Sequence, residues 1–168
     1  DVPETQRFRA TQRGESLHAE LHNIPTSTAG NNWALIVVDE YIRYAWITFT
    51  KTKESSVIAR ELRNLINRLT NQFGCHVKRF RSDQGGEFLG ALVDTMPKER
   101  GIEHEVSPAK THKYNGITER VAAVIKTMSR SQLAAAGISS ETYLVAESLA
   151  AATFVRNHLP TEANVGLF

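Results

Sequence analysis

Cysteine is almost absent from this chain, which has one, Cys75, among 168 residues. A single thiol cannot form an internal disulfide, and a zinc site built from two or more cysteines of the chain is excluded as well. The histidines do not supply such a site either. His18 and His22 lie four residues apart on an expected strand and turn, where this spacing does not bring two rings together. We therefore expect no zinc in this chain.

Long hydrophobic runs and a strong charge imbalance are also missing. No apolar stretch approaches the roughly 20 residues that cross a bilayer, so we expect no membrane partner. The 20 Lys and Arg against 18 Asp and Glu exclude a polybasic arm and an acidic tail. Any nucleic-acid binding must then come from where the charges lie. The sequence begins with neither Met nor an apolar signal core, so we expect an intracellular segment of a longer protein.

The hydrophobic periodicity predicts one α/β domain with a mixed five-stranded sheet and helices on both faces. We expect a polar linker or arm over 1–15, the folded domain over 16–161 and a tail over 162–168. The predicted strands are 17–21, 33–38, 44–50, 76–81 and 101–106. The predicted helices are 53–73, 87–96, 117–136 and 140–158.

Three acids stand at the ends or starts of predicted elements. Glu20 is on the first strand, Asp83 follows the fourth in a Gly-rich turn, and Glu119 opens a helix. Such ends converge where α/β folds place their sites. Three carboxylates there would repel one another unless a cation lay between them, and Mg²⁺ prefers oxygen ligands. From position alone, solvated surface acids remain the alternative.

Several motifs, in order along the chain, favour the metal site. They resemble the integrase catalytic core of copia-type LTR retrotransposons over about 16–161. The 35 residues between Asp83 and Glu119 (84–118) match that family's Asp–Asp–(35)–Glu signature. The resemblance implies an RNase H-like fold. The matching segments are Ile36–Tyr41, Arg43–Trp46, Arg81–Phe88, Gly101–Glu105, Ser107–Pro108, Asn115–Arg120, Arg130–Leu133, Ala135–Gly137 and Arg156–Pro160.

The resemblance implies a polynucleotidyl transferase that processes the 3′ ends of element DNA and joins them to target DNA. Glu20, Asp83 and Glu119 would be the catalytic residues and the ligands of Mg²⁺ or Mn²⁺. Two such ions can clamp the attacking and leaving oxygens at phosphorus. DNA, further copies of the chain and an upstream zinc module in the full polyprotein are the expected partners. Action in the nucleus is expected too.

DNA contacts are expected along the helix that follows Asn115 and in the loop before it. Lys126 lies two turns after Glu119 on the same face, where integrases place a lysine that holds the DNA end. An exposed solubilising lysine is the alternative. An inward stripe is expected at Ile117, Val121, Val124, Ile125 and Met128. The expected DNA-binding residues are Lys126, Arg130, Arg120, Lys110, Lys113 and Tyr114.

Two departures from the family pattern leave the activity open. Glu20 stands where the family has Asp, and its extra methylene moves the carboxylate by about 1.5 Å. A misplacement near 1 Å can cost about 100-fold in rate. After Glu119 the chain has Arg120-Val-Ala-Ala123 instead of a basic stretch. A catalytically inactive nucleic-acid-binding or relic domain and a ribonuclease H therefore remain alternatives. We interpret Asp39 as structural.

Overall fold

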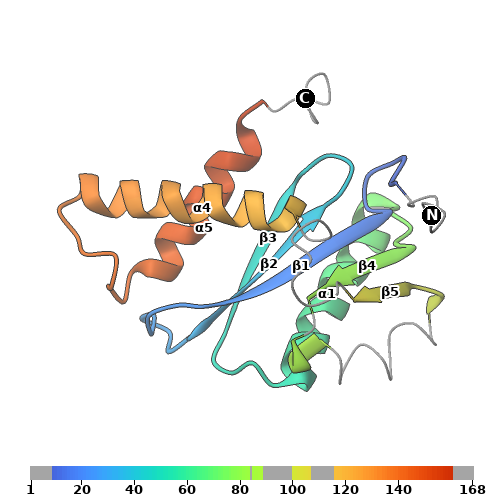
Figure 1. The fold of residues 1–168 in the computed structure, drawn as a ribbon, viewed down its shortest axis with the longest axis horizontal. Coiled ribbons are helices and arrows are strands. Elements are labelled where there is room, and N and C mark those ends of the chain that lie inside the picture. The colour runs from blue at the N-terminus through green and yellow to red at the C-terminus, as the bar shows by residue number, and fades with distance from the viewer. Residues whose placement is uncertain (1–8, 84, 89–99, 107–115, 161–168) are drawn as a thin grey trace, which may run out of the picture.

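The computed structural model describes residues 9–83, 85–88, 100–106 and 116–160. These ranges contain a five-stranded sheet of order β3-β2-β1-β4-β5 (Figure 1). β1 pairs antiparallel with β2 and parallel with β4, so the mixed sheet predicted from the sequence is confirmed. The strands are β1 Ser16–Asn23, β2 Trp33–Asp39, β3 Ala45–Thr50, β4 Arg79–Ser82 and β5 Glu103–Val106.

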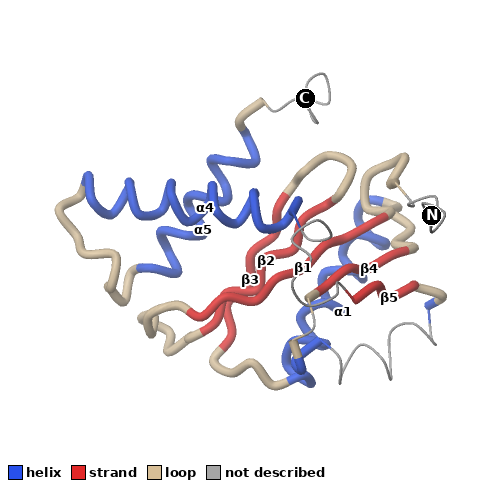
Figure 2. Tube along the Cα trace, in the orientation of Figure 1, coloured by secondary structure: helices blue, strands red, loops and turns tan. Residues whose placement is uncertain are grey.

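Helices cover both faces of the sheet, as predicted (Figure 2). Side chains alternate along a strand, so Leu17 and Ala19 of β1 pack on one face with helix α1, Ser55–Phe73. Helices α4, Gly116–Ala135, and α5, Val145–His158, pack on the other face. None of the helices in the described ranges combines the length and hydropathy needed to cross a membrane.

Helical spacing of apolar residues explains both long helices. The buried stripe of α1 ends where the Cys75 backbone N–H donates to the Leu69 carbonyl at 3.1 Å. On α4, Val121 and Ile125 are buried as predicted. Val124 is 48% exposed, so its place in the predicted stripe is wrong. Its position falls beyond the edge of the narrow arc that faces the sheet.

Three element boundaries differ from the prediction. β4 begins at Arg79, and the backbone N–H groups of Lys78 and Arg79 both donate to the Glu15 carbonyl, at 2.9 and 3.1 Å. β5 begins at Glu103. α5 begins at Val145, and the five residues before it are turns in which Glu141 N–H bonds the Ser139 hydroxyl. Most of the helix predicted over 87–96 lies outside the described residues.

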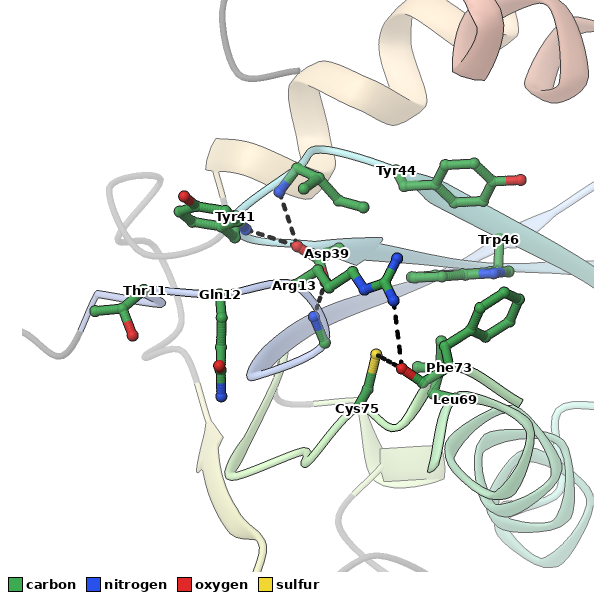
Figure 3. A pocket seen from close by; sticks show the side chains of 12 residues that line it. Thr11, Gln12, Arg13, Asp39, Tyr41, Tyr44, Trp46, Leu69, Phe73 and Cys75 are labelled. Atoms are coloured by element: carbon green, nitrogen blue, oxygen red, sulfur yellow. Dashed lines mark hydrogen bonds between the residues drawn. The ribbon is translucent and has the colours of Figure 1, made fainter. Parts of the chain in front are cut away.

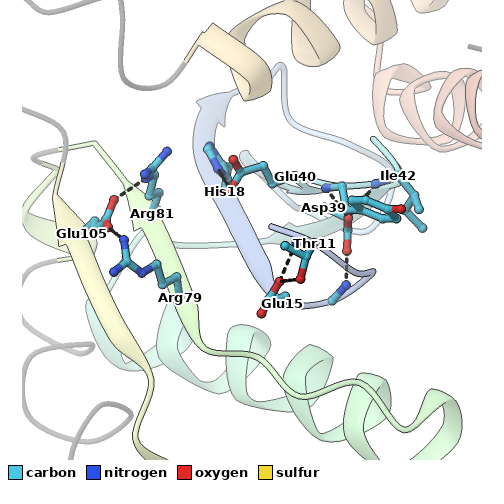
Figure 4. A network of polar contacts seen from close by, with 11 residues as sticks. Thr11, Glu15, His18, Asp39, Glu40, Ile42, Arg79, Arg81 and Glu105 are labelled. Atoms are coloured by element: carbon cyan, nitrogen blue, oxygen red, sulfur yellow. Dashed lines mark hydrogen bonds and ion pairs between the residues drawn. The ribbon is translucent and has the colours of Figure 1, made fainter. Parts of the chain in front are cut away.

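The last two residues of the predicted linker, Gly14 and Glu15, are packed against the domain, whereas 11–13 are exposed. Glu15 is only 3% exposed. Its carboxylate accepts hydrogen bonds from the Thr11 backbone N–H and from Lys78 Nζ, each at 2.7 Å. Figure 4 shows the Thr11 contact beside the sheet. Residues 1–8 and the predicted tail over 162–168 lie outside the described residues.

Asp39 organises the turn between β2 and β3. It is 1% exposed, and its carboxylate accepts backbone hydrogen bonds from Tyr41 at 2.7 Å, Ile42 at 2.9 Å and Gly14. Burial raises the pKa of Asp39, whereas the three N–H groups favour its charged form. Asp39 therefore joins the chain before β1 to the hairpin, which confirms its structural role.

Replacing Gly14 with alanine should destabilise the domain more than the same change at Gly74. Both glycines have positive φ, 74° and 62°, so both variants carry the strain of about 1 kcal/mol that L residues meet there. At Gly14 the new Cβ would also stand 2.5 Å from Cys75 Cβ, whereas nothing lies within 4 Å at Gly74. Urea unfolding should show a loss of about 3 kcal/mol for Gly14→Ala. Equal losses in the two variants would contradict this packing.

Acid should weaken the anchor at Glu15. Its bonds with Lys78 and then with the Thr11 backbone lower the pKa of Glu15 from 4.5 to about 2. Because the folded state binds this proton less readily, the stabilisation is complete above pH 4.5 and is lost as the pH falls towards 2. Glu15→Gln should flatten the fall in stability across that window in acid unfolding. Glu141→Gln, at an exposed position, should leave it unchanged.

Candidate functional site

The central strand β1 carries an unusual row of polar side chains. Ser16, His18, Glu20 and His22 alternate with the apolar residues that face α1, so they lie on the face covered by α4 and α5. Ser16 and His18 are fully buried, and His18 Nε2 lies 3.4 Å from Glu40 Oε2 (Figure 4). Burying polar groups at the centre of a sheet costs stability unless they are paired. This row is therefore a candidate site.

Strand register brings Glu20 and Asp83 to the same level. β1 and β4 are parallel neighbours, and His18 is the register partner of Arg81. Glu20 and Asp83 each lie two residues further along the chain, beyond the last paired positions of the two strands. Asp83 directly follows the last residue of β4, and its Oδ1 accepts the Gly85 backbone N–H at 3.0 Å. The register therefore directs both acids towards the same end of the β1–β4 pair, and their joint role in a site stays a prediction.

Glu119 comes from a different element. It lies exposed in the first turn of α4, the helix that packs on the β1–β2 region. Within the described ranges no three His, Cys, Asp or Glu side chains gather as a metal-binding group. The fold therefore carries Glu20 on β1, Asp83 just after the neighbouring β4 and Glu119 on the covering helix.

Lys126 reaches back to β1 through His22. Lys126 Nζ lies 2.8 Å from His22 Nδ1, and His22 Nε2 lies 3.4 Å from Glu20 Oε2. Burial lowers the pKa of Lys126, the charge of Glu20 opposes this shift, and Arg130 adds to it. The solubilising role considered for Lys126 therefore does not fit. The sequence analysis missed His22, although its position two residues after Glu20 on one strand face was a signal.

The other predicted DNA contacts are placed unequally. Arg120 is exposed and donates Nε–H to the Gly116 carbonyl at 2.9 Å. Arg130 is exposed and, with Lys126 and His22, lines a cavity of about 320 Å³ between the end of β1 and the helices α4 and α5. Lys110, Lys113 and Tyr114 lie outside the described residues.

The basic side chains of β4 are engaged in ion pairs on the sheet. Arg79 and Arg81 both contact the Glu105 carboxylate, as Figure 4 shows. Arg79 also lies 2.9 Å from Glu103. These ion pairs link β5 to β4 and largely neutralise the charges of the two arginines. The basic groups closest in sequence to Glu119 are on α4 itself.

Comparison with known proteins identifies relatives, although no family model matches the chain. It is 30% identical over 162 residues to the retrovirus-related Pol polyprotein from transposon RE1 of Arabidopsis thaliana, covering 95% of this chain and 11% of that protein. It is 29% identical over 136 residues to the corresponding polyprotein from transposon TNT 1-94 of Nicotiana tabacum, covering 80% of this chain and 10% of that protein. The chain thus spans about a tenth of these relatives.

Solved structures agree with these relatives. The simian T-cell lymphotropic virus intasome, in complex with a PP2A regulatory subunit, gives a TM-score of 0.72 at 16% identity, covering 92% of this chain and 52% of that one. The dimeric HTLV-2 integrase catalytic core domain with magnesium gives 0.66 at 15% identity, covering 90% and 92%. The chain is a homologue of retrovirus-related Pol polyproteins and has the integrase core fold. The RNase H-like fold class is confirmed.

This integrase-like core has a second, larger cavity away from the acids. It measures about 440 Å³ and lies between the segment before β1, the β2–β3 hairpin and the end of α1 (Figure 3). Arg13 and Cys75 each contact the Phe73 carbonyl there, and burial raises the pKa of the Cys75 thiol. Its lining contains none of Glu20, Asp83 and Glu119, so it is separate from the candidate site.

Proposed function

We propose that this chain is the catalytic core of a copia-type retrotransposon integrase. In this proposal it is a metal-dependent polynucleotidyl transferase that performs 3′ processing of element DNA and strand transfer into target DNA. The observation that supports it is the parallel pairing of β1 with β4, whose last paired positions come two residues before Glu20 and Asp83, with Glu119 on the covering helix. The homologous Pol polyproteins and the integrase core fold support it.

The donor set suits a hard divalent cation. Glu20 Oε2 is buried without a hydrogen-bond partner, and such an oxygen can accept a metal ion. Glu20, Asp83 and Glu119 would hold Mg²⁺ or Mn²⁺, in one or two positions. When bound, such ions lower the pKa of an attacking hydroxyl or water and stabilise charge at phosphorus.

The residues of the chain would position the DNA. Lys126 carries a part-buried ammonium group beside the acid of β1, where it can bind a phosphate near the reacting bond. Arg130 and Arg120, both exposed on α4, would bind phosphates along the same strand. The loop residues Lys110, Lys113 and Tyr114 would complete this contact.

DNA and further copies of the chain are the proposed partners, with an upstream zinc module in the full polyprotein and action in the nucleus. Solved neighbours include a dimeric integrase core and an intasome, which supports assembly. α5 also exposes large apolar side chains, among them Phe154 at 64% and Val155 at 39%. Such a surface suits contact with another protein surface.

A nucleic-acid-binding domain without catalysis is the second candidate. Two observations favour it: Glu20 replaces the family's aspartate, and the described acids do not close into a three-ligand group. It predicts DNA binding that needs no divalent cation. A ribonuclease H would instead prefer RNA–DNA hybrids.

Asp83→Asn should abolish strand breakage by the chain. Disintegration of a branched DNA with Mn²⁺ or Mg²⁺ is the measurement, because it needs only the core. Removing one ligand charge should cost at least the roughly 100-fold that a 1 Å misplacement costs. Glu61→Gln, on α1 at the opposite face, is the matched control and should retain activity.

The outcomes separate the candidates. Full activity of Asp83→Asn would contradict the proposed site. No disintegration by the unaltered chain, with DNA binding retained, would favour the inactive domain. Preference for an RNA–DNA hybrid over branched DNA would favour ribonuclease H.

Lys126→Met should weaken DNA binding at every sequence tested. A lysine that neutralises one phosphate releases about one counterion, so the slope of log K against log salt should fall by about 1. Fluorescence anisotropy over a salt series measures this. Lys51→Met, at an exposed position after β3, is the control and should leave the slope unchanged. An unchanged slope for Lys126→Met would contradict phosphate binding.

A further inference from the structure

His22 lies between an acid and a base that come from different parts of the chain. Its Nδ1 is 2.8 Å from Lys126 Nζ on α4, and its Nε2 is 3.4 Å from Glu20 Oε2 on β1. The side chains of His22 and Glu20 are 13% and 20% exposed. Both ring nitrogens therefore face a charged group, and little solvent competes.

The groups that neighbour the His22 ring determine which of its nitrogens carries the proton. An ammonium group has donors only, so Lys126 donates and His22 Nδ1 must accept. The ring proton is then on Nε2, which faces Glu20 Oε2. These two atoms are buried and 3.4 Å apart without forming a hydrogen bond, so the contact between them is electrostatic. The Lys126 ammonium group, the His22 imidazole ring and the Glu20 carboxylate therefore lie in a row, in that order.

We propose that His22 is a positioning residue that links the DNA-binding Lys126 to the metal-binding carboxylate of Glu20. Its Nε2 faces the carboxylate at 3.4 Å and restricts where that group can turn, and its Nδ1 holds the ammonium group at the end of the same strand. The catalytic consequence rests on the proposed function, whereas the bridge itself does not. Partners of this kind orient metal-binding carboxylates, and their loss typically costs about 10–100-fold in metal affinity or activity.

The bridge also accounts for glutamate at position 20. Glu20 and His22 are two residues apart on one face of β1, so their side chains are neighbours. The additional methylene of glutamate extends the carboxylate towards the His22 ring by about 1.5 Å. An aspartate would end short of this 3.4 Å contact. Glu20 and His22 therefore form a matched pair.

The bridge can be tested without activity. Long-range ¹H–¹⁵N NMR of the imidazole rings reports which nitrogen carries the proton, and the spectrum of His22→Gln assigns the His22 signals. We expect a neutral His22 ring with the proton on Nε2 in the unaltered chain. Lys126→Met should weaken that preference. A proton on Nδ1, an imidazolium ring, or a preference unchanged by Lys126→Met would overturn the bridge.

The catalytic consequence needs a double-mutant cycle. His22→Leu, which removes both contacts, should lower disintegration about tenfold with Glu20 present. In the Glu20→Asp background the same change should cost less than about twofold, because the contact is already lost. Equal losses in both backgrounds, or higher activity for Glu20→Asp than for the unaltered chain, would overturn the matched pair.

Two substitutions at position 22 test the two contacts of His22 separately. Gln carries a donor near the place of Nε2, so His22→Gln should retain most of the activity. Asn carries an acceptor near the place of Nδ1, so His22→Asn should retain most of the DNA affinity and lose activity. His76→Leu, exposed before β4, is the control and should change neither. The reverse pattern would overturn the assignment of the two nitrogens. If the unaltered chain were inactive, the proposed function would fail while NMR still decided the bridge.

Discussion

The parallel pairing of β1 with β4 is the constraint on which the site depends. β1 is the central strand, and its register with β4 pairs His18 with Arg81, two residues before Glu20 and Asp83. A shift by one residue would turn the polar row of β1 towards α1 and its core. The apolar residues Leu17 and Ala19, fully buried against α1, oppose that shift. The hydrophobic face of β1 therefore fixes the position of its polar face.

The polar face of β1 combines paired and unpaired groups. His18 lies beside Glu40, and His22 lies near both Glu20 and Lys126. At the neighbouring strand, Arg79 and Arg81 share the carboxylate of Glu105. These contacts limit the cost of burying charge. A buried side-chain atom in each of the four members of the polar row nevertheless has no hydrogen-bond partner among the described residues, which sets this row apart from an ordinary packed core.

The lysine of α4 connects the packing of that helix to the chemistry of the site. Val121 and Ile125 are buried against the sheet, and this packing sets the height of Lys126 above β1. Burial lowers the pKa of Lys126, the charge of Glu20 opposes this shift, and Nζ lies 2.8 Å from His22 Nδ1. A bound phosphate would add a negative charge beside the ammonium group. Helix packing and the proposed DNA binding therefore depend on the same turn of α4.

The sequence by itself determined the order of the described strands and helices and the mixed sheet, because alternation and helical spacing are local patterns. It also identified Asp39 as structural, and its motif spacing predicted Asp83, Glu119 and Lys126 as site residues. Only the tertiary structure placed Glu15 in the fold, exposed Val124 and brought Lys126 to His22. These contacts join residues as far apart as 22 and 126, and such pairs depend on strand register and helix packing. The proposed role of His22 also needed the tertiary structure, because its two neighbours lie on different elements and no local sequence pattern connects them.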